Sequence, residues 1–171
     1  GWINAVFNAD CTLLAANGRN GAMMIWDLRT GQPSLTFTQD VPYWGIDWMP
    51  GGRSFLVGTT GGAAELDAQT GAMIRMIPID DAVGASSAAM LRIAPSGEIA
   101  ALPTRSGIAV IDLSAGRVRT VLRGHTQQVT TVAFSADSLR LASTGWDRTV
   151  RIWNLETGTQ ERAFWGHGEE G

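Results

Sequence analysis

The feature that most constrains this chain is a segment that recurs along it. Residues 124–158 contain three short runs of alternating apolar residues separated by turn-forming residues. Residues 7–31 align with residues 134–158 without a gap, and the identical pairs include Phe7 with Phe134, Trp26 with Trp153 and Gly31 with Gly158. Because side chains on a strand alternate between two faces, this pattern predicts a meander of short antiparallel strands.

Two weaker copies of the segment fill the middle of the chain. Each copy of the segment ends in a glycine, and the four glycines are 40, 45 and 42 residues apart: Gly31, Gly71, Gly116 and Gly158. A period of roughly 40–45 residues is typical of four-stranded propeller blades. Glycine makes up 21 of 171 residues, well above the usual ~7%, as many tight turns require. The sequence therefore predicts an all-β fold without helices.

The unit boundaries follow from this alignment. We expect one partial domain over 1–171, with units at 1–38, 39–84 (including a loop), 85–123 and 124–167, and a tail at 168–171. The innermost strand of the third unit is expected over 88–93. The longest irregular stretch, residues 78–87, is predicted to be the loop that precedes it.

Several phrases in the last unit resemble the WD-repeat β-propeller family. They are Gly124-His125, the segment 132–137, Leu141-Ala142-Ser143, the segment 147–154 and Thr157-Gly158. Asn154 replaces the usual Asp of the family dipeptide, whereas Trp26-Asp27 in the first unit matches it. The resemblance implies four blades of four antiparallel strands each.

The resemblance also implies a ring larger than these four blades. Rings of this family usually have about seven or eight blades, and each blade needs neighbours to bury its two faces. We therefore expect an arc of a larger ring. The remaining blades would come from a longer parent chain, a partner chain or a second copy, and a ring closed by four blades alone is the rarer alternative.

Four polar residues of the last unit could suggest a Ser-His-Asp catalytic triad. The resemblance instead implies a structural relay, in which Asp147 accepts from one ring nitrogen of His125 and Ser143 joins the other nitrogen and accepts from Trp153. In the two middle units the Ser and Trp positions change together, to Val57 with Leu66 and to Leu102 with Ile111. Joint loss fits a structural pair, because removing both partners of a hydrogen bond costs far less than orphaning one.

Partners of this family commonly dock on the blade edge that carries the turns between second and third strands. The residue before the relay Asp projects there, and it is Trp146 in the last unit. Trp and Arg are enriched in interface hot spots. The predicted partner-binding set is Trp146, Arg19, Arg105, Thr60, Gln128, Tyr43 and Trp44. The alternative is that Trp146 and Trp44 fold down between blades.

Three further tryptophans, Trp2, Trp48 and Trp165, are predicted to pack rather than to contact a ligand. Two arginines beside an aromatic residue would favour an acidic or phosphorylated peptide.

Charge and composition exclude several function classes. The net charge of −3, without a basic run, removes the usual attraction to nucleic acid or to an anionic membrane. No apolar stretch reaches the ~18–20 residues that cross a bilayer, and no signal peptide is recognisable. The single cysteine, Cys11, allows no intrachain disulfide or cysteine-pair metal site. We therefore expect a cytoplasmic protein without metal or cofactor.

The leading functional prediction is a non-enzymatic scaffold or sensor module that binds a protein or peptide, as one region of a multidomain protein. The alternative is a propeller enzyme or cofactor-binding domain with its chemistry at the mouth of the central channel. This alternative needs reactive groups converging there, and the chain has only two histidines, His125 and His167.

Overall fold

The computed structural model describes residues 2–18, 21–38, 44–80, 90–104 and 107–166. The side chains of Trp2, Ile3 and Trp44 are not part of this description. These residues form four four-stranded antiparallel sheets, and in each sheet the strands lie side by side in chain order. No helix in the described ranges has the length and apolar composition to span a membrane.

The strands are short and regular. Sheet 1 holds β1 (Trp2–Phe7), β2 (Leu13–Gly18), β3 (Ala22–Asp27) and β4 (Gln32–Thr38). Sheet 2 holds β5 (Trp44–Trp48), β6 (Ser54–Thr59), β7 (Gly62–Asp67) and β8 (Met73–Pro78). Sheet 3 holds β9 (Arg92–Ile93), β10 (Ile99–Thr104), β11 (Gly107–Asp112) and β12 (Arg117–Leu122). Sheet 4 holds β13 (Val129–Phe134), β14 (Arg140–Gly145), β15 (Thr149–Asn154) and β16 (Thr159–Trp165).

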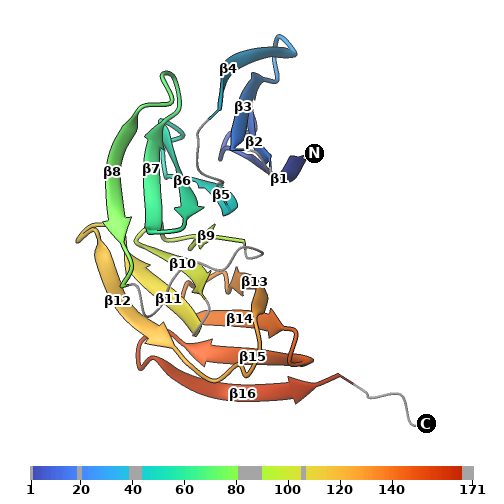
Figure 1. The fold of residues 1–171 in the computed structure, drawn as a ribbon, viewed down its shortest axis with the longest axis vertical. Coiled ribbons are helices and arrows are strands. Elements are labelled where there is room, and N and C mark those ends of the chain that lie inside the picture. The colour runs from blue at the N-terminus through green and yellow to red at the C-terminus, as the bar shows by residue number, and fades with distance from the viewer. Residues whose placement is uncertain (1, 19–20, 39–43, 81–89, 105–106, 167–171) are drawn as a thin grey trace.

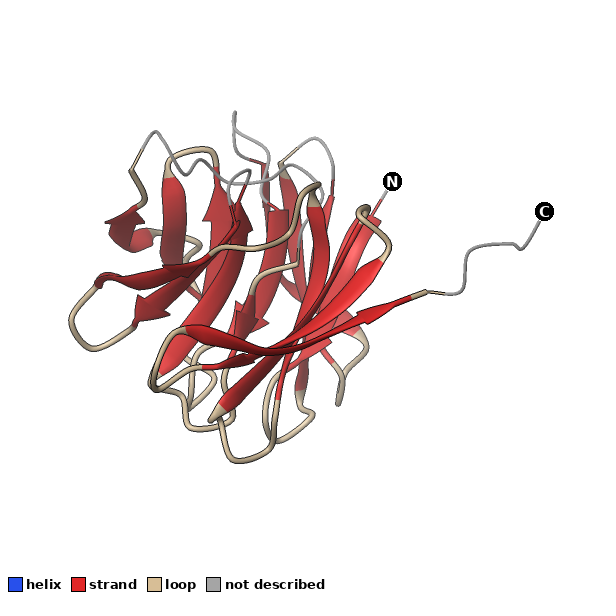
Figure 2. Ribbon diagram, turned by 90° about the horizontal axis from the view of Figure 1, so that it is seen from below, coloured by secondary structure: helices blue, strands red, loops and turns tan. Residues whose placement is uncertain are grey.

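The four sheets follow one another along an open arc (Figure 1), which confirms the predicted all-β arrangement of four blades. The first strands of the sheets, β1, β5, β9 and β13, lie on the inner side of the arc, and the last strands lie on its rim (Figure 1). Seen from the side, turns gather at both ends of the strands (Figure 2). We call the end with the β2–β3, β6–β7, β10–β11 and β14–β15 turns the upper edge, and the opposite end the lower edge.

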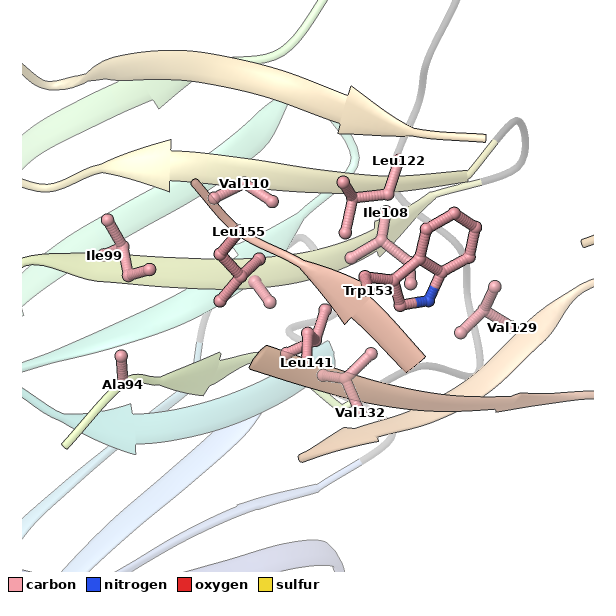
Figure 3. Close-up of a cluster of buried hydrophobic side chains, with 11 residues drawn as sticks. Ala94, Ile99, Ile108, Val110, Leu122, Val129, Val132, Leu141, Trp153 and Leu155 are labelled. Atoms are coloured by element: carbon pink, nitrogen blue, oxygen red, sulfur yellow. The ribbon is translucent and has the colours of Figure 1, made fainter. Parts of the chain in front are cut away.

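Apolar side chains hold neighbouring sheets together, with one buried cluster at each of the three junctions. The cluster between sheets 1 and 2 includes Met23, Ile25 and Phe55, and the cluster between sheets 2 and 3 includes Leu56 and Leu102. Figure 3 shows the cluster between sheets 3 and 4, where Trp153 lies beside Ile108, Leu122 and Val129. Sheets 2 and 3 therefore bury both faces, whereas sheets 1 and 4 each bury one.

The turn between the third and fourth strand of each sheet has a common design, seen first in sheet 1. The carboxylate of Asp27 accepts from the N–H groups of Arg29 (2.8 Å) and Thr30 (3.3 Å), and Gly31 closes the turn at a φ of 70°. Asn154 accepts in the same way from Glu156 (2.9 Å) and Thr157 (3.0 Å). Since the turn needs only a side-chain oxygen acceptor, Asn154 takes the same role in sheet 4 as Asp27 in sheet 1.

Two expectations are corrected by the structure. The innermost strand of sheet 3 was predicted over 88–93, but only Arg92 and Ile93 pair with β10, and residues 88–89 lie outside the described ranges. The N–H of Ile93 donates instead to Asp47 of sheet 2, at 2.8 Å. Trp48 packs as predicted, with 7% of its surface exposed, whereas Trp165 is 73% exposed. It lies on the outermost strand, where no described element covers it.

Candidate functional site

A chain of hydrogen bonds runs through the upper half of sheet 4 and joins three of its segments. The indole Nε1 of Trp153 donates to Ser143 Oγ at 2.8 Å, and this Oγ lies 2.7 Å from His125 Nε2. The other ring nitrogen, Nδ1, lies 2.9 Å and 3.0 Å from the carboxylate oxygens of Asp147. We call these four residues the relay.

The donor and acceptor groups of the relay fix the direction of each of its hydrogen bonds. An indole nitrogen can only donate, so Ser143 Oγ accepts from Trp153 and has one hydrogen to give. In the neutral imidazole, Ser143 then donates to Nε2, and the Nδ1 hydrogen points at the carboxylate of Asp147. Each buried polar group of the relay is thereby paired.

The carboxylate of Asp147 receives more donors than any other group in this site. Burial by itself would raise the pKa of Asp147. The side-chain hydrogen bond from Thr149, the N–H of Thr126 and the ring of His125 outweigh this effect and lower the pKa to about 2. Asp147 is therefore an anion at neutral pH, and it fixes the loop containing His125 to the β14–β15 turn.

The relay is closed to solvent. The side chains of His125 and Asp147 are 2% and 3% exposed, and Ser143 is 1% exposed. A triad nucleophile must reach a substrate, but the Ser143 hydroxyl is held between an indole and an imidazole below the surface. This geometry leaves Ser143, His125 and Asp147 without a reactive atom open to solvent. The positions that match Ser143 in sheets 2 and 3 are the fully buried Val57 and Leu102.

The relay supports an exposed aromatic residue at the upper edge. Trp146 lies in the β14–β15 turn and is 62% exposed, so it does not fold down between sheets. Its N–H donates to the carbonyl oxygen of Gln128 at 2.9 Å, and the following residue is the buried Asp147. A Cβ at the preceding residue, Gly145, would lie 2.8 Å from His125 Nδ1, so the close approach requires glycine.

The other predicted partner-binding residues are placed less completely. Thr60 is exposed in the β6–β7 turn at the upper edge, Gln128 is half-buried, and Trp44 begins β5. Arg19, Tyr43 and Arg105 lie outside the described residues. Among the predicted residues whose side chains the structure describes, Trp146 is therefore the large exposed side chain at the upper edge.

Trp165 is a candidate that the sequence reasoning missed. It pairs with Thr149 at the end of β16, and the next residue, Gly166, donates to the carbonyl oxygen of Arg148 at 3.0 Å. Both Trp146 and Trp165 thus lie at the upper end of sheet 4. The signal for its exposure is position: Trp165 lies on the outermost strand of its sheet, beyond the reach of a neighbouring sheet.

No group of three or more His, Cys, Asp or Glu residues in the described ranges is arranged to hold a metal ion. Cys11 is exposed in the β1–β2 turn and forms no disulfide.

The comparisons with known proteins agree with the fold. A family model described as "WD domain, G-beta repeat" matches residues 116–154, which span β12 of sheet 3 and the first three strands of sheet 4. This segment contains the whole relay. Residues 116–154 therefore match a repeat of the WD-repeat family.

Two curated relatives extend the similarity to most of the chain, and a third matches a shorter part of it. WD repeat-containing protein SL1-17 of Schistosoma mansoni is 28% identical over 92% of the chain and 52% of its own length. Periodic tryptophan protein 2 homolog of Dictyostelium discoideum is 27% identical over 87% of the chain and 16% of its own length. MST50-interacting protein 11 of Pyricularia oryzae is 39% identical over 31% of the chain and 17% of its own length. The chain thus spans at most about half the length of these relatives.

Proposed function

We propose that this WD-repeat chain is a protein-interaction platform, and that the upper end of sheet 4 is its main contact surface. The observation that carries the proposal is the exposure of Trp146 on a turn whose next residue is locked into the buried relay. Large aromatic side chains supply much of the binding energy at interfaces. An anchor held in place before binding also loses little conformational freedom when a partner docks.

Two further observations support a protein partner. Trp165 adds a second exposed indole at the same end of the sheet. One relative is named for an interaction with another protein, MST50. The closed relay speaks against chemistry at this place, because its hydroxyl and imidazole have no access to a substrate.

The preferred chemistry of the partner stays a prediction. An acidic or phosphorylated peptide was inferred from Arg19 and Arg105, which the structure does not describe. We further propose that the platform acts in the cytoplasm, within a longer protein whose other regions complete the ring.

The test compares two exposed apolar side chains at opposite edges of sheet 4. Trp146 is 62% exposed at the upper edge, and Leu139 is 56% exposed at the lower edge. Tagged chains carrying Trp146→Ala or Leu139→Ala are used in parallel pull-downs, and the recovered partner is then titrated as a purified protein. A hot spot costs about 2 kcal/mol or more on truncation, or roughly 30-fold in Kd. We expect this loss for Trp146→Ala and none for Leu139→Ala; equal binding by both variants contradicts the proposal.

A further inference from the structure

The lower edge of the arc carries two pockets at equivalent places, one between sheets 1 and 2 and one between sheets 3 and 4. The first has a volume of about 660 Å³ and is lined by Leu13, Ser34, Gly52, Arg53, Asp67, Ala68 and Gln69. The second has a volume of about 310 Å³ and is lined by residues that include Ile99, Arg119, Leu139, Leu155 and Glu156. The repeat alignment places these residues at matching positions of their units.

Two matching positions carry smaller side chains in the larger pocket than in the smaller one. Ser34 stands where the smaller pocket has Arg119, and Ala68 stands where it has Leu155. Both changes remove side-chain atoms from the junction. The larger pocket thus has small residues at both places, and its volume lies within the ~300–1,000 Å³ of typical ligand sites.

The larger pocket combines an apolar floor with an available cation. Leu13 and Ala68 border the buried cluster between sheets 1 and 2. Arg53 replaces Leu139 of the smaller pocket, and no hydrogen bond or ion pair of its guanidinium is found with the described residues. A guanidinium presents a planar fork of donors that suits a carboxylate.

The one carboxylate in the lining is already engaged. Asp67 Oδ1 accepts from the N–H groups of Gln69 (3.0 Å) and Thr70 (2.8 Å) and from the Thr70 hydroxyl (2.9 Å). These hydrogen bonds, led by the one from the Thr70 N–H, lower the pKa of Asp67. Asp67 therefore holds its own turn, and Arg53 remains the group that can receive an anion.

We propose that the pocket between sheets 1 and 2 binds the C-terminus of a peptide that ends in an apolar residue, so that an apolar side chain stands next to a carboxylate. The apolar side chain occupies the space opened by Ser34 and Ala68, and the carboxylate pairs with Arg53. This site lies at the lower edge, opposite Trp146, so it is independent of the contact surface proposed above.

The test uses two small probes that differ only in the carboxylate, N-acetyl-L-leucine and N-acetyl-L-leucinamide. Each is titrated into the isotope-labelled chain while amide signals are followed by NMR. We expect N-acetyl-L-leucine to give saturable shifts at Ser34, Arg53 and Ala68. A hydrogen bond to a charged group contributes about 1.5–3 kcal/mol, so the amide probe should bind about tenfold more weakly or worse.

Four variants locate the binding. Ala68→Leu and Arg53→Leu each introduce the residue that the chain itself uses at the matching position of the smaller pocket, and each should abolish the shifts. Arg29→Leu makes the same charge change at an exposed turn of the same edge and should leave them intact. Trp146→Ala should also leave them intact, which separates this site from the upper edge.

Absence of saturable shifts with N-acetyl-L-leucine at millimolar concentrations overturns the proposal. Equal affinity for the two probes, or unchanged binding by Arg53→Leu, overturns the role of the carboxylate.

Discussion

Replacing Ser143 by Ala tests whether the relay braces the fold. The hydroxyl of Ser143 is 1% exposed and contacts both the Trp153 indole at 2.8 Å and His125 Nε2 at 2.7 Å. Alanine leaves the indole N–H without its acceptor and the ring nitrogen without its donor. Each buried polar group left unsatisfied costs about 1–3 kcal/mol. We therefore expect Ser143→Ala to lower the free energy of unfolding by at least about 2 kcal/mol.

The assay is denaturation followed by circular dichroism, with heat and with urea. For a chain of this size, 1 kcal/mol corresponds to about 2–4 °C in Tm, so a fall of at least about 4 °C is expected. A double-mutant cycle with Trp153→Phe isolates the indole contact. In the Trp153→Phe background no indole N–H is left to orphan, so Ser143→Ala should cost about 1 kcal/mol less than in the wild type.

Additive effects would refute this reasoning. If Ser143→Ala costs the same in both backgrounds within about 0.5 kcal/mol, the indole and the hydroxyl are not coupled. The middle sheets give the natural comparison, because Val57 with Leu66 and Leu102 with Ile111 fill these positions without polar atoms.

Three further predictions follow from single positions. The pKa of Asp147 falls from 3.8 to about 2 on folding. Its ionised carboxylate therefore adds on the order of 2 kcal/mol to the free energy of unfolding, fully present above pH ~4 and lost as the pH falls toward 2. Urea titrations at about pH 6 and about pH 3 should show this pH-dependent part in the wild type and not in Asp147→Asn. Gly45 and Gly31 both have positive φ (69° and 70°), but only at Gly45 would a Cβ overlap the main-chain nitrogen of Leu91. Gly31→Ala should therefore lower the free energy of unfolding by the backbone cost alone, about 1–3 kcal/mol. Gly45→Ala should lower it clearly more in the same urea assay, and equal losses of stability would contradict the overlap. Trp146→Ala should change the free energy of unfolding by no more than about 0.5 kcal/mol, because the Trp146 side chain is largely exposed. A large fall in Tm would show instead that this side chain packs in the core.

The repeating fold could be predicted because its cause is local. Alternating apolar residues define the strands, and the turns between third and fourth strands reuse one Asp or Asn acceptor and one glycine at a fixed spacing. The short β9 could not be predicted in this way. Its Ile93 N–H donates to Asp47, a residue 46 positions away in another sheet, and such contacts leave no trace in the local pattern.

The candidate sites were predictable to different degrees. The resemblance to the WD-repeat family indicated the four relay residues and the turn that carries Trp146. The exposure of Trp165 depends on which elements lie next to its strand in three dimensions. The periodicity of the sequence does not contain this information. The lower-edge pocket did have a signal in the sequence: comparing Ser34 with Arg119 and Ala68 with Leu155 across the repeat shows where side-chain volume is missing.

The unequal burial of the four sheets has a consequence for dynamics. Sheets 2 and 3 are covered on both faces, whereas Val150 and Phe164 of sheet 4 remain exposed on its free face. Amide protons of sheet 4 should therefore exchange with solvent through partial openings that leave the two central sheets intact. A ligand that binds Trp146 and also covers Val150 and Phe164 would stabilise the closed form of sheet 4 and so make those openings rarer. Occupancy of the upper edge would then be readable as slower deuterium uptake in β14, β15 and β16.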